Sequence, residues 1–214
     1  MIKAVLFDYD GTFMNTRDSV LGLWKIFLEK EGNLVLSEDE MSEIFRLPIE
    51  ASFAKYFPEQ TLEEIMDVYK DYQKKYLIPR EPFDGMVDLV KSCYDKGYKI
   101  GLVTSRQGVS AKKGLTNSGV IDCFSSLVTS ETCENHKPSK DPIIACVNEL
   151  GVSTDETVMV GDSLSDLESG KNAGVPIILV GWTEDLDKHN PPEHCPPYAV
   201  CETSEEIFDT ILNM

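Results

Sequence analysis

Short apolar runs rich in β-branched residues recur along the chain, and most of them are followed by a segment with helical periodicity. Runs of this kind are typical of strands in a parallel sheet that is buried on both faces. We therefore predict an α/β fold, a doubly wound parallel sheet whose right-handed crossovers place helices on both of its faces. The predicted strands are residues 2–7, 99–103, 127–129, 157–160, 176–180 and 198–201, and helices of this part are predicted at residues 85–96 and 139–150.

One stretch, residues 15–80, interrupts the alternation because it contains helical patterns and no convincing strand. Within it, Ser37 with Glu40 and Thr61 with Glu64 have the spacing of capping boxes, which mark helix starts. Helices are predicted at residues 18–31, 38–45 and 62–76. We therefore predict a core of residues 1–14 and 81–214 and an inserted helical domain of residues 15–80. Aromatic residues at helical spacing are expected to form the core of the insert: Trp24, Phe27, Phe45, Phe53, Tyr56 and Phe57.

The charge of the chain limits its partners. The formal net charge is −17, from 20 Lys and Arg against 37 Asp and Glu. Such a surface repels nucleic-acid phosphates and anionic lipid, so we expect no nucleic-acid partner and no membrane. A small phosphorylated substrate is compatible with this charge if a bound cation and a few hydrogen-bond donors make the electrostatic potential at the site positive. The first residues do not resemble a leader, so we expect a cytoplasmic protein, and the sequence carries no signal for its oligomeric state.

The cysteines give no sign of a disulfide framework or a zinc site. Six cysteines are present without any C-x-x-C pair, and a chain with so large an expected core has little need of disulfides. His189, His194, Cys195 and Cys201 are of metal-binding types, but their spacing fits no standard zinc pattern and four prolines among them indicate a loop. We interpret these four as incidental surface residues.

Polar side chains follow the predicted strands at the point where each strand ends. In an open parallel sheet, ligands bind outside the carboxyl ends of the strands. The loops after the first, second and fourth strands and the segment before residue 139 should therefore bring four acids, a hydroxyl group and a lysine to one edge of the sheet. These residues are Asp8, Asp10, Asp162, Asp166, Thr104 and Lys137.

Taken in the order of the chain, the segments that contain these residues resemble the four signature motifs of the haloacid dehalogenase-like phosphohydrolases. Asp8-Tyr9-Asp10-Gly11-Thr12 is similar to the first motif, Thr104 to the second, and Lys137 with Pro138 to the third. Residues 162–174 are similar to the last motif over its whole length. The resemblance covers nearly the whole chain and looks most like the phosphoglycolate phosphatases. It implies a Rossmann-like core in which residues 15–80 form a helical cap.

The resemblance also implies a mechanism. Asp8 is expected to attack phosphorus and form an acyl phosphate, and Asp10 to protonate the leaving oxygen and then deprotonate water. Asp8, the backbone carbonyl of Asp10 and Asp162 are expected to bind Mg²⁺. An acid at position 10 indicates phosphoester cleavage, because the dehalogenase members of the family generally lack it.

Other residues are expected to support this chemistry. Thr104 and Lys137 would bind the transferring phosphoryl group and offset its charge, and Asp166 would orient Lys137 or a metal-bound water. Ser105 and Ser163 are expected in supporting positions beside them. In the cap, Arg46 is a candidate for binding an anionic group of the substrate, and a surface arginine is the alternative.

The sequence leaves the substrate specificity and part of the function open. Where family members usually continue the first motif with Leu and a later Asp or Ser, this chain has Phe13, Met14, Asn15 and Thr16, which puts its specificity in doubt. The favoured function is a Mg²⁺-dependent phosphatase acting on a small phosphorylated metabolite. The alternatives are an inorganic pyrophosphatase or a sugar-phosphate mutase of the same superfamily and, from another class, a phospho-accepting or catalytically silent binding module.

Overall fold

The computed structural model describes residues 1–46, 49–76, 80–183 and 186–214, without the side chains of Phe45 and Arg46. The chain forms two compact units. Unit 1 consists of Met1–Asn15 with Glu81–Met214, and unit 2 is Thr16–Arg80. The boundary between the first segment of unit 1 and unit 2 lies one residue later than predicted. The role of unit 2 as a cap stays a prediction.

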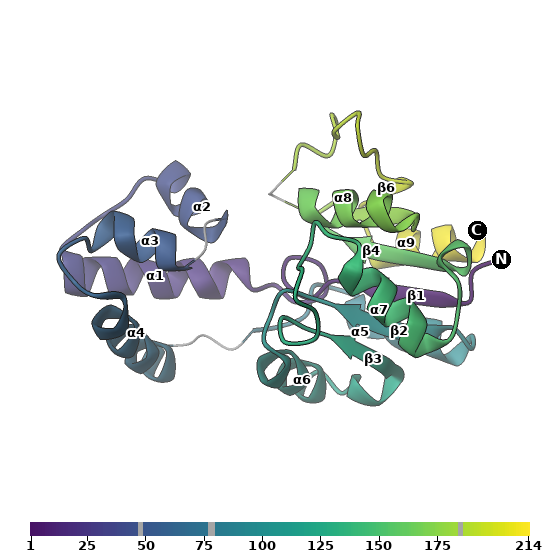
Figure 1. Cartoon of the computed structure of the whole chain (residues 1–214), viewed down its shortest axis with the longest axis horizontal. Coiled ribbons are helices and arrows are strands. Elements are labelled where there is room, and N and C mark those ends of the chain that lie inside the picture. The colour runs from purple at the N-terminus through teal and green to yellow at the C-terminus, as the bar shows by residue number, and fades with distance from the viewer. Residues whose placement is uncertain (47–48, 77–79, 184–185) are drawn as a thin grey trace. The chain divides into compact units, whose positions relative to one another are not determined.

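Unit 1 contains a six-stranded sheet in which every neighbouring pair of strands is parallel, in the order β3-β2-β1-β4-β5-β6 (Figure 1). The predicted fold class is therefore confirmed. One strand begins earlier than predicted, since β3 starts at Phe124, and the two serines that follow interrupt the apolar pattern there. The strands are β1 Ala4–Phe7, β2 Lys99–Val103, β3 Phe124–Val128, β4 Thr157–Gly161, β5 Ile177–Val180 and β6 Ala199–Cys201.

Helices cover both faces of this sheet, which explains why its central strands are continuous apolar runs. In β1, Val5 and Phe7 belong to one buried cluster and Ala4 and Leu6 to the other. The first cluster includes α5 Met86–Asp95, α6 Gly108–Asn117 and α9 Ser204–Leu212, and the second includes α7 Asp141–Leu150 and α8 Leu164–Ala173. Helices α6, α8 and α9 were given no predicted range, and α6 buries only Ala111 and Leu115 in its weakly periodic sequence.

Unit 2 is helical and has its own aromatic core. The Trp24 ring centroid lies 5.0 Å from that of Phe53 and 5.1 Å from that of Tyr69. Burial of Trp24, Phe27, Phe53 and Phe57 confirms the predicted core, whereas Tyr56 is partly buried and the Phe45 side chain lies outside the described part. Both predicted capping boxes are present in the hydrogen bonds. The helices are α1 Arg17–Gly32, α2 Glu38–Arg46, α3 Ile49–Tyr56 and α4 Leu62–Tyr76, of which α3 was not predicted.

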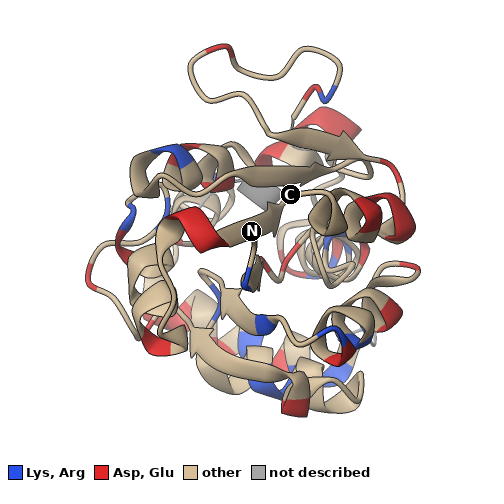
Figure 2. Cartoon of the chain, turned by 90° about the vertical axis from the view of Figure 1, so that its right-hand side faces the viewer, with Lys and Arg blue, Asp and Glu red and all other residues tan. Residues whose placement is uncertain are grey.

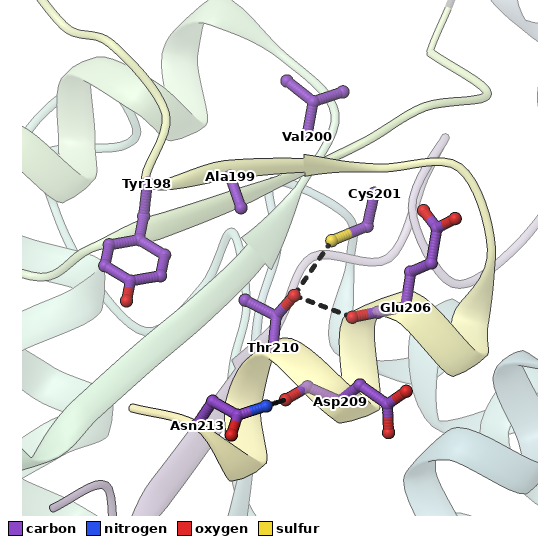
Figure 3. Close-up of a pocket in the computed structure, with 8 residues that line it drawn as sticks. All are labelled: Tyr198, Ala199, Val200, Cys201, Glu206, Asp209, Thr210 and Asn213. Atoms are coloured by element: carbon purple, nitrogen blue, oxygen red, sulfur yellow. Dashed lines mark hydrogen bonds between the residues drawn. The ribbon is translucent and has the colours of Figure 1, made fainter.

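The surface carries many more acidic than basic side chains, and Figure 2 shows Asp and Glu spread over the helices. Among the described residues, no helix combines the length and the apolar character that crossing a membrane requires. A shallow pocket lies between β6 and α9, where Thr210 Oγ1 is 3.5 Å from Cys201 Sγ (Figure 3). None of the predicted site residues lines it.

The four residues that we interpreted as surface residues include two that are buried. All six cysteines are free, as predicted, and His189 and His194 are exposed. Cys195 and Cys201 are buried, however, because their side chains pack as small apolar groups in the two hydrophobic clusters of unit 1.

Candidate active site

The sheet reverses its strand order between β1 and β4, and this is where open α/β sheets bind ligands. From β1 the order runs through β2 to β3 on one side, whereas β4, β5 and β6 lie on the other. Asp8 directly follows β1, and its amide donates to the carbonyl of Val160 in β4 at 3.0 Å. Asp162 directly follows β4. The two loops therefore leave the sheet next to each other, each with an aspartate at its start.

Lys137 joins these loops in a buried ion cluster. Its Nζ donates to Asp8 Oδ1 and to Asp166 Oδ1, each at 2.6 Å, and to the carbonyl of Val103 at 3.3 Å. The exposed fractions of the side chains are 5% for Lys137, 7% for Asp8 and 0% for Asp166. Because an ammonium group has three N–H donors, these contacts use all of them and fix the lysine.

The cluster contains more negative than positive charge. Burial raises the pKa of Asp8 to about 7, with Asp166 and Asp10 adding to the rise and Lys137 opposing it. Burial, together with Asp8 and Asp166, also holds the pKa of Asp162 well above its usual range. The pKa of Lys137 is raised, because the two carboxylates outweigh the effect of its burial. One lysine does not balance three buried carboxylates, so a further cation is favoured here.

The donor set fits a hard divalent cation. In the described part of the chain, Asp8, Asp162 and Asp166 are the one group of three or more His, Cys, Asp or Glu side chains with ligand atoms close enough to share a metal, all within 4.8 Å. Asp8 Oδ1 accepts from Lys137 and Asp162 Oδ1 accepts from Thr12 at 3.0 Å, so the Oδ2 atom of each can serve as a ligand. Carboxylate oxygens of this kind suit Mg²⁺. The backbone carbonyl of Asp10 stays a predicted ligand.

Asp166 is better placed to hold Lys137 than to bind a metal. Its Oδ1 accepts from Lys137, and its Oδ2 accepts from the Ser163 hydroxyl at 2.6 Å and from the amides of Asp162 and Ser163. Ser163 in turn caps α8, since its Oγ accepts from the amide of Asp166. The sequence predicted that Asp166 orients Lys137 or a metal-bound water, and its bond to Lys137 is compatible with the first of these roles.

Asp10 lies on the same loop as Asp8 but has a different partner. Arg106 donates from Nε to Asp10 Oδ2 at 2.8 Å and from Nη2 to Asp10 Oδ1. No motif of the sequence marked Arg106 as a partner of Asp10. Its position, two residues after Thr104 and just before α6, was the one available signal.

Thr104 is brought to the same edge, whereas Ser105 is turned to solvent. Thr104 is buried at the end of β2, and its Oγ1 accepts from the amide of Arg106 at 3.1 Å. Ser105 is exposed. Arg46 ends α2, but its side chain lies outside the described residues, so its role in binding an anionic group stays a prediction.

Helix α8 supports the segment that carries Lys137. Ser169 Oγ donates to the carbonyl of Ser139 at 2.7 Å, and Asn172 Nδ2 donates to the carbonyl of Pro138 at 3.0 Å. With Asp166, these residues recur every third position and so lie along one side of the helix. The resemblance to the last family motif covers this segment, but no function was predicted for Ser169 and Asn172.

The loop after β5 also contributes contacts that the sequence did not reveal. Trp182 Nε1 donates to the carbonyl of Gly11 at 3.1 Å, and Thr183 Oγ1 donates to the carbonyl of Asp162 at 2.7 Å. These bonds tie the loops that bear Asp8 and Asp162 to a third loop. No motif follows β5, and only its position at the carboxyl end of a predicted strand could have indicated it.

Gly11 allows a close approach between two of these loops. It has φ +81°, and a Cβ atom there would lie 2.2 Å from Asp162 Oδ2. We expect Gly11→Ala to lower the free energy of unfolding by more than the ~1–2 kcal/mol that a left-handed residue costs, because the clash adds to the backbone strain. Gly97→Ala is the matched control, since Gly97 has φ +88° with nothing within 4 Å of the added atom. Urea denaturation of both variants measures the difference, and equal losses would contradict the clash.

Comparisons with known proteins find relatives that match most of this chain. A family model described as haloacid dehalogenase-like hydrolase matches residues 5–180. A PpaX protein of Clostridium perfringens is 36% identical over 196 residues, which cover 89% of this chain and 91% of the relative. The pyrophosphatase PpaX of Halalkalibacterium halodurans is 32% identical over 199 residues, covering 90% and 91%.

Solved structures show the same fold. A HAD-superfamily hydrolase from Geobacter sulfurreducens aligns with a TM-score of 0.79 at 24% identity, covering 98% of this chain and 96% of that chain. A haloacid dehalogenase-like family protein from Streptococcus pneumoniae aligns with a TM-score of 0.81 at 18% identity, covering 98% of both. At these identities the likeness concerns the fold alone.

Proposed function

Because the chain belongs to the haloacid dehalogenase-like hydrolase family, we propose that it is a magnesium-dependent phosphatase that transfers a phosphoryl group first to Asp8 and then to water. The observation that carries the proposal is the buried Asp8 carboxylate, held 2.6 Å from Lys137 Nζ beside Asp162. A carboxylate is a competent nucleophile at phosphorus when positive charge offsets its repulsion from the phosphoryl oxygens.

The residues around Asp8 are suited to hold the phosphoryl group. Lys137 orients Asp8 and supplies a positive charge that all substrates of the site would share. Thr104 Oγ1 accepts from the amide of Arg106, so its own proton can be donated to a phosphoryl oxygen. When bound by Asp8 and Asp162, Mg²⁺ would supply further neutralisation of the phosphoryl charge.

Asp10 is proposed as the acid and base of the reaction. In the first step, a bond forms between Asp8 and phosphorus while the bond from phosphorus to the leaving oxygen breaks, and Asp10 gives that oxygen its proton. In the second step, Asp10 takes a proton from the water that attacks the aspartyl phosphate. Phosphate leaves, and Asp8 returns to a carboxylate.

We propose two candidate substrates. The first is a small phosphomonoester of the phosphoglycolate type, as the four motifs suggested. The second is inorganic pyrophosphate, which is favoured by the name pyrophosphatase of a relative that is 32% identical over 90% of this chain. Both candidates need the same nucleophile, and they differ in whether the leaving group is an alkoxide or a phosphate.

Phosphate release from a panel of small phosphate esters and pyrophosphate tests the proposal. With Mg²⁺, we expect turnover of at least one compound, and we expect this turnover to stop on chelation. Ca²⁺ should inhibit it, because the larger and less regular coordination shell of Ca²⁺ misplaces the ligands. Circular dichroism after chelation checks that the fold persists. Undiminished release after thorough chelation would contradict the metal role of Asp8 and Asp162. A stable phosphoprotein without turnover would favour a phospho-accepting module.

A further inference from the structure

The Arg106 guanidinium is fixed on several sides at the edge of the site. Its Nε and Nη2 donate to the two oxygens of Asp10, and its Nη1 donates to Ser110 Oγ in α6 at 3.0 Å. The guanidinium carbon lies 5.4 Å from the centre of the Tyr9 ring, within the range of a cation–π contact. The exposed fraction of the arginine side chain is only 17%. An arginine bound in this way has one orientation rather than many.

Among the described residues, Arg106 is the one side chain that donates hydrogen bonds to the Asp10 carboxylate. The Asp10 side chain is 30% exposed and belongs to the turn after β1, where a short carboxylate can adopt more than one rotamer. The two parallel N–H···O bonds from Arg106 determine both the position and the plane of the carboxylate. A lysine at position 106 would supply charge but not this fork.

Arg106 also contacts the residue proposed to bind the phosphoryl group. Its backbone amide donates to Thr104 Oγ1 at 3.1 Å, while its side chain holds Asp10. A single residue thus sets the separation between the proton donor and the phosphoryl site. Effective proton transfer requires that the donor lie within hydrogen-bond reach of the leaving oxygen.

We propose that Arg106 is a positioning residue that aligns the Asp10 carboxyl group with the leaving oxygen of the substrate. This inference rests on the proposed function, in which Asp10 gives its proton to that oxygen. Arg106 keeps all its own protons throughout, because a guanidinium is not deprotonated in proteins. The arginine therefore acts through Asp10 and not on the phosphoryl group.

A positioning role for Arg106 should affect poor and good leaving groups differently, whereas a merely structural role would affect both alike. An alkoxide leaves only if it receives a proton, whereas 4-nitrophenolate leaves readily without one. The value of kcat/KM reports the steps up to the first bond cleavage, so it should reveal this difference. Loss of Arg106 should slow an alkyl phosphate such as glycerol 2-phosphate far more than 4-nitrophenyl phosphate.

The test compares Arg106→Met with wild type on these two substrates, with Mg²⁺ present. For Arg106→Met we expect kcat/KM to fall by about 10²-fold for the alkyl phosphate and by less than about 5-fold for the aryl phosphate, following the usual size of acid–base contributions. Arg106→Lys should recover little of the alkyl rate. Lys113→Met, which removes an exposed charge from the same helix, is the control and should change neither substrate.

A double variant separates positioning from a general electrostatic effect. If Arg106 acts through Asp10, Asp10→Asn/Arg106→Met should be no slower on the alkyl phosphate than Asp10→Asn alone. Equal losses of Arg106→Met on both substrates, or additive losses in the double variant, would overturn the proposal while leaving the phosphatase function intact. A wild type that releases phosphate from no compound of the panel would remove the proposed function, and the role of Arg106 with it.

Discussion

Asp8→Asn is expected to reduce phosphate release to background, a loss on the order of 10⁴–10⁶ if removal of the proposed nucleophile costs what it does in other covalent enzymes. Asn keeps the shape of the side chain and still offers an oxygen to Lys137, but its amide does not attack phosphorus. The fold should persist, because the substitution removes one of three crowded negative charges and Lys137 keeps its bond to Asp166.

Phosphate release with the best substrate of the panel, together with urea denaturation, measures both parts of this prediction. Asp155→Asn is the matched control, since it makes the same change at an exposed position before β4 and should leave the rate and the stability unchanged. An Asp8→Asn protein that keeps most of the wild-type turnover would mean that Asp8 is not the nucleophile. Loss of folding in that variant would mean instead that the Asp8 charge is needed for stability.

The central part of the sheet could be predicted from the sequence because burial on both faces leaves a simple pattern. Strands β1 and β5 are apolar and buried at every position, so their runs stand out without any periodicity. Strand β3 is different, because Ser126 lies within it. That serine is buried because its hydroxyl donates to Glu149 in α7, a partner 23 positions away that the local pattern does not reveal.

The site could be predicted to the extent that its residues follow strands directly. Asp8 and Thr104 occupy the first position after a predicted apolar run and Asp162 the second, so locating the strands also located them. Arg106 and Trp182 could not be assigned in this way. Their importance depends on contacts with Asp10 and Gly11 across 96 and 171 positions, which only the folded arrangement of the loops creates.

The strongest effect on stability is expected from Lys137→Met. The side chain is buried and forms short bonds to Asp8 and Asp166, so its removal leaves carboxylates facing one another without the shared cation. Breaking a buried ion pair from one side costs about 3–5 kcal/mol, and we expect a loss of that size in urea denaturation without metal. Catalysis should fall on the order of 10²–10³ in kcat/KM, by similar factors for every substrate, because in the proposed mechanism Lys137 offsets the charge of the phosphoryl group that all of them transfer.

A second substitution tests whether the loss arises from the uncompensated carboxylates. Lys137→Met/Asp166→Asn removes one of them and should regain part of the stability lost in Lys137→Met, but not the activity. Lys140→Met, at an exposed lysine three residues away, is the control for a change of net charge and should behave like wild type. Equal stability of Lys137→Met and wild type would show that the ion cluster contributes nothing to folding. If the double variant were less stable than Lys137→Met, the hydrogen bonds of Asp166 to Ser163 and to the start of α8 would outweigh the relief of its charge.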